Sequence, residues 1–124
     1  MQGIDAVLSD LWNRNEHISA ISIINISNNS ILYQTDNWDI SPDLQRIQSA
    51  WDDHGAGIEV QGIHYSILQS TPERLVCTNV GGQGHIAASK EGNLLGIAYF
   101  LPYADLGASY MDVARVVRAL NKKK

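Results

Sequence analysis

Residues 57–100 have the sequence GIEVQGIHYSILQSTPERLVCTNVGGQGHIAASKEGNLLGIAYF. Short turn sequences rich in Gly, Pro and Asn divide this stretch into segments of strand length, at 58–60, 63–69, 74–80, 85–90 and 94–100. Connections of at most about five residues are too short for the crossover that parallel pairing needs. The sequence therefore predicts an antiparallel meander.

The region before the meander predicts a helix and a hairpin. β-Branched segments at 18–26 and 31–35 flank 27–30, whose two Asn residues tolerate the positive φ of a tight turn. Ahead of them, apolar residues recur at the three-and-four spacing of one helix face: Ile4, Val7, Leu8, Leu11 and Trp12.

A short helix is predicted between the hairpin and the meander. Ser41 is placed to cap free amides, and Pro42 suits the first helical position. Gly55 is the expected left-handed end. Leu44, Ile47 and Trp51 share one face of this helix.

A closing helix follows Pro102, and Ser109 and Asp112 are its expected caps. Its apolar face consists of Leu106, Tyr110, Val113, Val117 and Leu120. The order helix, hairpin, helix, meander, helix predicts one α+β domain over residues 1–124. We expect a central antiparallel sheet of six to seven strands, with the terminal helices on one face.

Composition limits the classes of function. The net charge of −4 and the absence of a basic face disfavour nucleic-acid binding. The single Cys77 cannot form an internal disulfide, and no signal peptide is recognisable, so we expect a cytoplasmic protein. The longest apolar runs are far below the roughly 20 residues of a membrane span.

No catalytic or metal-binding motif is recognisable. His17, His54, His64 and His85 lack metal-ligand spacing, and Cys77 alternates with Val76 as a small buried residue would. The glycine-rich segment 81–84 lacks the Lys and Ser or Thr of a phosphate-binding loop. We expect a protein that is not an enzyme and that needs no metal or cofactor.

Segments 33–42 and 57–69 together resemble the profilin family. The first is similar to that family's second strand, loop and Pro-capped helix start, and the second to its paired strands around a Gly. The glycine-rich turn, the strand end at 96–102, Gly107 and the helix at 111–120 follow in family order. Trp38, in the loop of the first segment, either packs over a sheet edge or contacts a partner.

The resemblance implies a cytoskeletal regulator that binds an actin monomer on its later strands and the start of its last helix. Sequestration or delivery of the monomer, and nucleotide exchange on it, would regulate polymerisation. Tyr110 and Arg115 rank first because Tyr and Arg are enriched at interface hot spots, although Tyr110 also suits a core position. The matching positions are His64, Ile67, Gln69, Thr78, Asn79, Lys90, Gly107, Tyr110, Ala114 and Arg115.

Two other ligands of the family are expected to bind weakly. Ile4, Val7 and Ala119 stand near positions where the family has aromatic rings, and a Lys tail replaces the terminal Tyr, so polyproline binding should be weak or absent. Phosphoinositides would have only scattered basic residues: Arg74, Lys90, Arg115, Arg118 and the tail at 122–124. These departures resemble the divergent profilins of Asgard archaea.

Two other architectures fit a chain of this length. A roadblock/LC7 or longin-like platform for a small GTPase also combines a sheet with flanking helices, but often dimerises, whereas a profilin-like protein should be a monomer. A sensor of the PAS kind needs a cavity between sheet and helices. The bulky stripe that includes Leu11, Trp12 and Val117 favours a filled core instead.

Overall fold

The computed structural model describes residues 3–15, 17–35 and 38–122, with side chains for 6–15, 17–35 and 38–121. The helices and strands are α1 (Gly3–Arg14), β1 (Ile18–Asn25), β2 (Ser30–Gln34), the 3-10 helix η1 (Ser41–Asp43), α2 (Leu44–Asp52), β3 (Gly57–Val60), β4 (Ile63–Ser70), β5 (Arg74–Thr78), β6 (His85–Glu91), β7 (Leu94–Phe100) and α3 (Leu106–Lys122).

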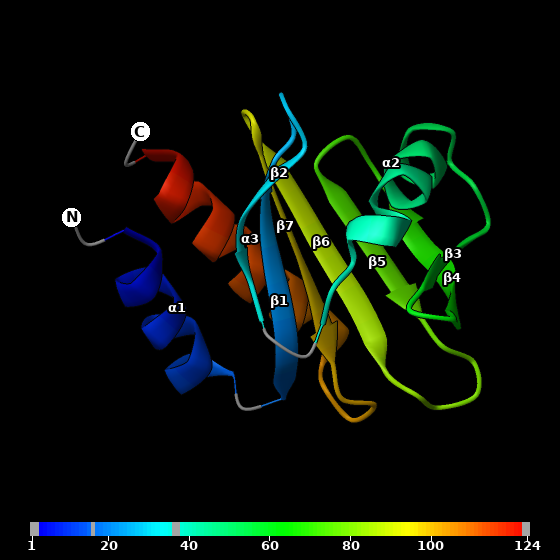
Figure 1. Ribbon diagram of the computed structural model, residues 1–124. Coiled ribbons are helices and arrows are strands. Elements are labelled where there is room, and N and C mark those ends of the chain that lie inside the picture. Colours follow the sequence, from blue (N-terminus) through cyan, green and yellow to red (C-terminus); the bar gives the residue numbers. More distant parts are fainter. Residues whose placement is uncertain (1–2, 16, 36–37, 123–124) are drawn as a thin grey trace.

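The strands form one sheet in the order β2-β1-β7-β6-β5-β4-β3 (Figure 1). All neighbouring pairs are antiparallel, and β3 to β7 are adjacent in space in their sequence order, which confirms the predicted meander. Gln61 and Gly62, with φ of 50° and 81°, join β3 to β4 in the left-handed turn typical of two-residue hairpins. The predicted α+β class is therefore confirmed.

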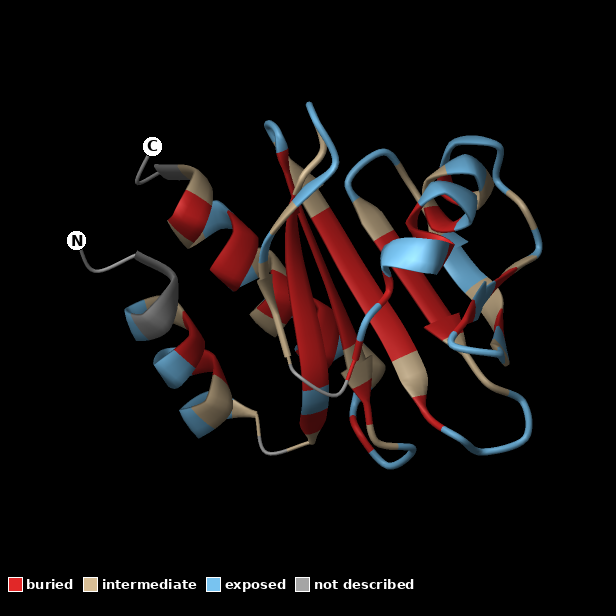
Figure 2. Ribbon diagram, viewed as in Figure 1, coloured by how far each residue is buried: buried red, intermediate tan, exposed pale blue. Residues whose placement is uncertain are grey.

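Each face of the sheet carries helices. The terminal helices α1 and α3 pack on one face, where Leu11 and Val113 are buried with Ile23. The other face carries η1 and α2, whose Ile47 and Trp51 are buried against it (Figure 1). Figure 2 shows the buried residues concentrated in the central strands and on the inward sides of the helices. The sheet is thus the middle layer between two apolar cores.

Strand β5 illustrates how one strand contributes to both cores. Val76 is buried with the terminal helices, whereas Leu75 and Cys77 are buried on the α2 side. The Cys77 side chain is fully buried, which confirms it as a small core residue. Burial raises the pKa of the Cys77 thiol to about 12, so the thiol stays protonated at neutral pH.

Helix α3 packs closely on Gly96 of β7. A Cβ atom at this position would lie 2.5 Å from Cγ2 of Val117 and 3.4 Å from Cδ1 of Ile23. Any larger residue must therefore push the helix away from the strand. The absence of a side chain at Gly96 sets the distance between α3 and β7.

On the other face, Trp51 fastens α2 to the turn between β4 and β5. Its Nε1 donates a hydrogen bond to the Thr71 carbonyl at 2.5 Å, and the Ser70 hydroxyl donates to the Trp51 carbonyl at 3.2 Å. The Nζ atom of Lys90 lies 4.2 Å above the ring and 3.6 Å from an Asp52 carboxylate oxygen. These contacts couple α2 to β4, β5 and β6.

The predicted ends of the short helix are wrong in detail. Ser41 makes no side-chain cap, because residues 41–43 form a separate 3-10 turn and its backbone N–H is bonded to Asp39 Oδ1. At the other end the left-handed residue is His54, with φ of 54°, rather than Gly55. The Gly55 N–H bonds to the Ala50 carbonyl at 2.8 Å, as in a Schellman motif.

The predicted caps of the closing helix are also wrong. The helix begins at Leu106, so Ser109 and Asp112 lie within it. Asp105 is the capping residue, because its Oδ1 accepts a hydrogen bond from the Ala108 N–H at 2.9 Å. The side chain of Asp112 instead accepts a hydrogen bond from Asn15 at the end of α1.

The tryptophans outside α2 also face the interior. Trp12 is partly buried against the terminal-helix core, as predicted. Trp38 is only 6% exposed and packs in the α2-side core, which decides between the two predicted roles in favour of packing. None of the helices among the described residues is long and apolar enough to cross a membrane.

We predict that Gly96→Ala lowers the free energy of unfolding by about 1–3 kcal/mol, because the added methyl group overpacks the contact with Val117. Gly107→Ala is the matched control. Position 107 is in a helix, and a methyl group added there would have no atom closer than 3.5 Å, so alanine should stabilise the protein by up to about 1 kcal/mol. Urea unfolding of both variants measures the difference, and equal effects would contradict it.

We also predict that the protein becomes less stable as the pH rises from 9 to 12. The unfolded chain loses the Cys77 proton near the ordinary pKa of 9.0, whereas the folded chain holds it to about 12. Above pH 9 the unfolded state therefore binds fewer protons, and stability falls by at most about 1.4 kcal/mol per pH unit from this group. Urea unfolding between pH 8 and 11 should show a shallower decline for Cys77→Ala.

Candidate functional site

Part of the sheet face that carries the terminal helices remains uncovered beside α3. Residues aligned across the strands share a face, and Thr78 of β5 is aligned with Ser66 of β4 and His85 of β6. β5 and β7 run in the same direction, so the loops after them lie at the same end of the sheet, where α3 begins. We call the open region the β4–β5–α3 surface and define it by Gln69, Arg74, Thr78, Val80, His85, Tyr103, Gly107, Tyr110, Met111 and Ala114.

A chain of contacts crosses this surface from β4 to α3. The Gln69 Oε1 atom accepts a hydrogen bond from Nη1 of Arg74 at 3.2 Å, and the Arg74 guanidinium lies 4.2 Å above the Tyr110 ring. The Tyr110 hydroxyl is 3.5 Å from the Glu73 carbonyl. Tyr110 is only 8% exposed and belongs to the terminal-helix core. Tyr110 therefore packs beneath the surface and holds its neighbours in place, and little of its ring is available to a partner.

A second group of contacts lies at the end of the sheet where α3 begins. Nδ1 of His85 is 2.8 Å from the Thr78 hydroxyl, and Nε2 is 2.8 Å from the Pro102 carbonyl. Thr78 was predicted from the sequence, but His85 was not. The only sequence signal for it was a histidine at a strand start, and that does not show which loop its ring reaches.

Three strongly exposed apolar residues of this surface were missed by the sequence analysis. Val80 is 86% exposed, Tyr103 71% and Met111 54%. Met111 was hidden by its position on the polar side of the last helix, and Val80 by the glycine-rich turn that follows it. An apolar residue in a turn or on a polar helix face is the signal that identifies such positions.

Ile67, Lys90 and Arg115 are placed apart from the β4–β5–α3 surface. Ile67 packs against the core on the α2 side, and the Lys90 side chain reaches Trp51 on that face. Arg115 bonds to Asp112 at 2.6 Å and lines the groove between α1 and α3. The structure therefore does not bring all ten predicted positions together.

The remaining predicted positions lie in or beside the surface. Gly107 is exposed in the first turn of α3, and Ala114 is partly buried one turn beyond Tyr110. His64 is exposed on β4, and Nδ2 of Asn79 donates to its carbonyl at 2.8 Å. Asn79 Oδ1 also accepts from the Gln83 N–H at 3.1 Å, so this side chain holds the β5–β6 loop against β4.

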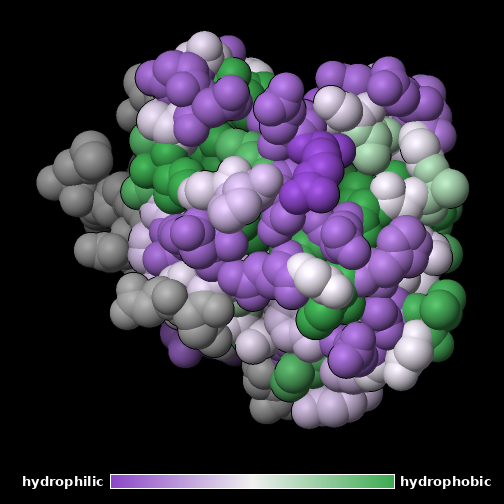
Figure 3. Space-filling model, turned by 45° about the vertical axis from the view of Figure 1, so that its right-hand side comes forward, coloured by the Kyte–Doolittle hydropathy of each residue, from purple (hydrophilic) through white to green (hydrophobic). Residues whose placement is uncertain are grey.

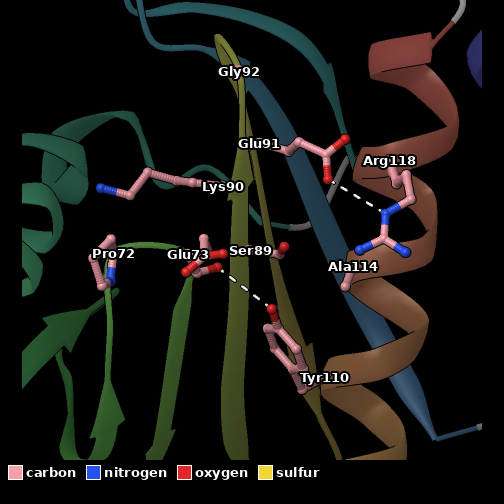
Figure 4. A pocket seen from close by; sticks show the side chains of 9 residues that line it. All are labelled: Pro72, Glu73, Ser89, Lys90, Glu91, Gly92, Tyr110, Ala114 and Arg118. Atoms are coloured by element: carbon pink, nitrogen blue, oxygen red, sulfur yellow. Dashed lines mark hydrogen bonds and ion pairs between the residues drawn. The ribbon is translucent and has the colours of Figure 1, made fainter.

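A cavity of about 420 Å³ lies between α3, β6 and the turn that precedes β5. Figure 4 shows Glu91 pointing toward Arg118 of α3, and Lys90 pointing away toward α2. The Glu91–Arg118 pair, at 3.4 Å, closes one end, and Tyr110 with Glu73 forms the other. Opposite charges are already paired here, so the cavity does not select strongly for an ion.

The groove between α1 and α3 has a volume of about 190 Å³ and no aromatic side chain in its described lining. Its apolar floor includes Leu11, Val116 and Ala119, and charged pairs flank it. Ile4, one of the positions predicted to replace a family aromatic, has its side chain outside the described residues. The described part of the groove offers no ring on which a polyproline helix could stack.

The basic residues considered for phosphoinositide binding are dispersed and engaged. Arg74 covers Tyr110, Lys90 covers Trp51, Arg115 pairs with Asp112, and Arg118 pairs with Glu91. Lys123 and Lys124, together with the side chain of Lys122, lie outside the described residues. Among the side chains that are described, no group of His, Cys, Asp and Glu is arranged to hold a metal ion.

Hydrophilic side chains dominate the side formed by α2 and the β3–β4 hairpin, where hydrophobic groups are scattered in separate patches (Figure 3). Within this side, the Ser41 N–H lowers the pKa of the exposed Asp39 carboxyl. Burial raises the pKa of Tyr65 to about 12. Neither pKa shift indicates a reactive group on this side of the molecule. We therefore place the candidate site on the β4–β5–α3 surface.

Comparison with known proteins assigns the chain to a family, although no family model matches it. It is 34% identical over 106 residues to Odin profilin of Odinarchaeota yellowstonii, covering 85% of this chain and 87% of the relative. It is 36% identical over 90 residues to Loki profilin-2 of Lokiarchaeum, covering 67% and 66%. A solved complex of LokiProfilin2 with rabbit actin matches with a TM-score of 0.85 at 30% identity, over 94% of this chain and 95% of that one. The chain belongs to the profilin family.

Proposed function

We propose that this protein binds an actin monomer through the β4–β5–α3 surface and thereby regulates actin polymerisation. The observation that carries the proposal is the likeness, over nearly the whole chain, to a profilin solved in complex with rabbit actin. A second complex, of LokiProfilin1 with rabbit actin, has a TM-score of 0.86 at 28% identity. Two related chains that bind the same partner support the same partner here.

The chemistry of the surface suits a protein partner. Protein interfaces combine an apolar centre with a rim of polar groups. Here Val80, Tyr103 and Met111 supply exposed apolar area, and Gln69 and Arg74 supply hydrogen-bonding groups at the other end of β5, next to Tyr110. Of the two residues ranked first from sequence, Tyr110 supports this surface, and Arg115 lies outside it. Both stay predictions, and we add Met111, which is 54% exposed on α3.

Binding alone accounts for the proposed activity, so we describe this protein as a regulator and not as an enzyme. A protein that occupies one end of an actin monomer blocks addition of another subunit there. If it binds one actin conformation more tightly than another, it shifts the monomer toward that conformation and changes nucleotide exchange. An actin regulator of this kind would act in the cytoplasm as a monomer.

Calorimetric titration against monomeric rabbit actin, combined with spontaneous polymerisation assays, tests the proposal. We expect saturable binding with a stoichiometry of one to one and a slower onset of polymerisation. Absence of binding at concentrations of about 100 μM would rule out rabbit actin as a partner. Sedimentation of the protein as a dimer would contradict the expected monomer.

We predict that Met111→Glu weakens actin binding by at least about tenfold, which corresponds to about 1.4 kcal/mol. The substitution places a charge in the apolar part of the surface, and Met111 is exposed enough for the fold to tolerate it. Leu32→Glu is the matched control, because Leu32 is 46% exposed on the distant edge strand β2. Equal affinities of the two variants would place the binding surface elsewhere.

We predict that a ten-residue polyproline peptide does not bind measurably. The described lining of the groove between α1 and α3 has aliphatic and charged side chains where stacking would need rings. Calorimetric titration up to about 1 mM peptide should give only heats of dilution. Saturable binding would contradict the prediction and would show that another part of the chain supplies the rings.

A further inference from the structure

We infer that His85 is a positioning residue of the actin-binding surface, which joins the loop before α3 to the end of β5. The inference rests on the proposed function, because it assigns His85 a role in binding actin. It concerns a residue on β6 that links two parts of the surface through the two nitrogens of its ring. Its expected effect on affinity is indirect, through the loop.

The two hydrogen bonds of the ring have defined directions. A carbonyl oxygen only accepts, so Nε2 of His85 carries a proton and donates it to the Pro102 carbonyl at 2.8 Å. In the neutral ring Nδ1 then accepts from the Thr78 hydroxyl, also at 2.8 Å. Thr78, His85 and Pro102 therefore form one continuous chain of hydrogen bonds from β5 through β6 to the loop.

The backbone around His85 fixes where the ring lies. His85 is aligned with Thr78 on one side and with Phe100 on the other, so the ring stands between the ends of β5 and β7. The preceding residue, Gly84, has a φ of 121°, and a Cβ atom there would lie 2.5 Å from the Tyr99 ring and 2.6 Å from the Phe100 carbonyl. This close approach holds the start of β6 against β7.

The loop after β7 is attached on two sides. On the α1 side, the Leu101 N–H donates to the His17 carbonyl at 3.0 Å, and the rings of Tyr103 and His17 meet edge to face with centroids 5.0 Å apart. On the β6 side, the His85 ring holds the loop through its hydrogen bond to the Pro102 carbonyl. Removing His85 would therefore release the side of the loop that faces β5.

The position of this loop matters because two of the exposed apolar side chains, Tyr103 and Met111, depend on it. It carries Tyr103 and leads through the cap at Asp105 into the turn of α3 that presents Met111. Val80 follows the end of β5, where Thr78 is aligned with His85. If the loop moves, a partner must order it again on binding, and affinity falls without the loss of any direct contact.

A double-mutant cycle with His85→Phe and Tyr103→Ala tests the inference, with affinity for monomeric rabbit actin as the readout. Phenylalanine keeps a ring but has no nitrogen. We expect His85→Phe alone to weaken binding by about five- to tenfold, the worth of one or two hydrogen bonds. In the Tyr103→Ala background it should cost only about two- to threefold, because one of the side chains that the loop positions is already absent and only the effect through α3 remains.

A fivefold or larger loss in both backgrounds would overturn the positioning role, since His85 would then act independently of Tyr103. An unchanged affinity of His85→Phe in the wild-type background would overturn it as well. Thr78→Val, which removes only the hydroxyl, serves if His85→Phe does not fold. Thr78→Ser, which keeps the hydroxyl, should restore most of the affinity lost in Thr78→Val.

Hydrogen exchange separates this inference from the proposed function. If the wild-type protein does not bind actin, the proposed function fails, but the effect of His85 on the loop can still be measured. His85→Phe should then accelerate exchange of the Ala104 amide, which bonds to the Leu101 carbonyl at 3.0 Å, by about fivefold or more. Unchanged exchange would show that His85 does not position the loop.

Discussion

The contact between α3 and β7 at Gly96 is the constraint on which the rest of the structure depends. Because Gly96 has no side chain, Val117 lies directly on the strand, and the helix covers β6 and β7 closely. A helix held this close to the centre of the sheet leaves part of β4 and β5 uncovered beside it. The open surface is therefore a consequence of how α3 is seated, and its polar residues can remain accessible.

The two faces of the sheet have different tasks. On the α2 side, Trp51 and Lys90 are committed to holding α2 and the β4–β5 turn. That turn also carries Glu73, whose carbonyl lies next to the Tyr110 hydroxyl on the opposite face. Side chains on one face thus fix the backbone that borders the surface on the other. A stable position of α2 is needed for the surface even though α2 does not form part of it.

Most of the fold could be predicted from the sequence, because period-two segments and short turns determine an antiparallel meander. The predicted helix ends were less accurate. A backbone hydrogen bond of Gly55 allowed His54 to take the left-handed position, and Asp105 was overlooked as a cap. The candidate site was predicted in part. Thr78 and Gly107 lie in it, but the Lys90 side chain points to the opposite face of the sheet, where it contacts Trp51. The face to which a strand residue points depends on its place in the strand, and residue type alone does not give it.

The strand order has a further consequence for the behaviour of the protein at high concentration. The unpaired edges of the sheet belong to β2 and β3, the former five residues long and the latter four. A strand from another molecule that pairs with so short an edge gains few backbone hydrogen bonds. The longer, more apolar strands β6 and β7 are interior, and β1 pairs with β7 from Ile18 to Asn25 and with β2 over Ser22–Asn25. The arrangement therefore protects the segments most prone to form intermolecular sheets, and it lowers the tendency of the protein to aggregate.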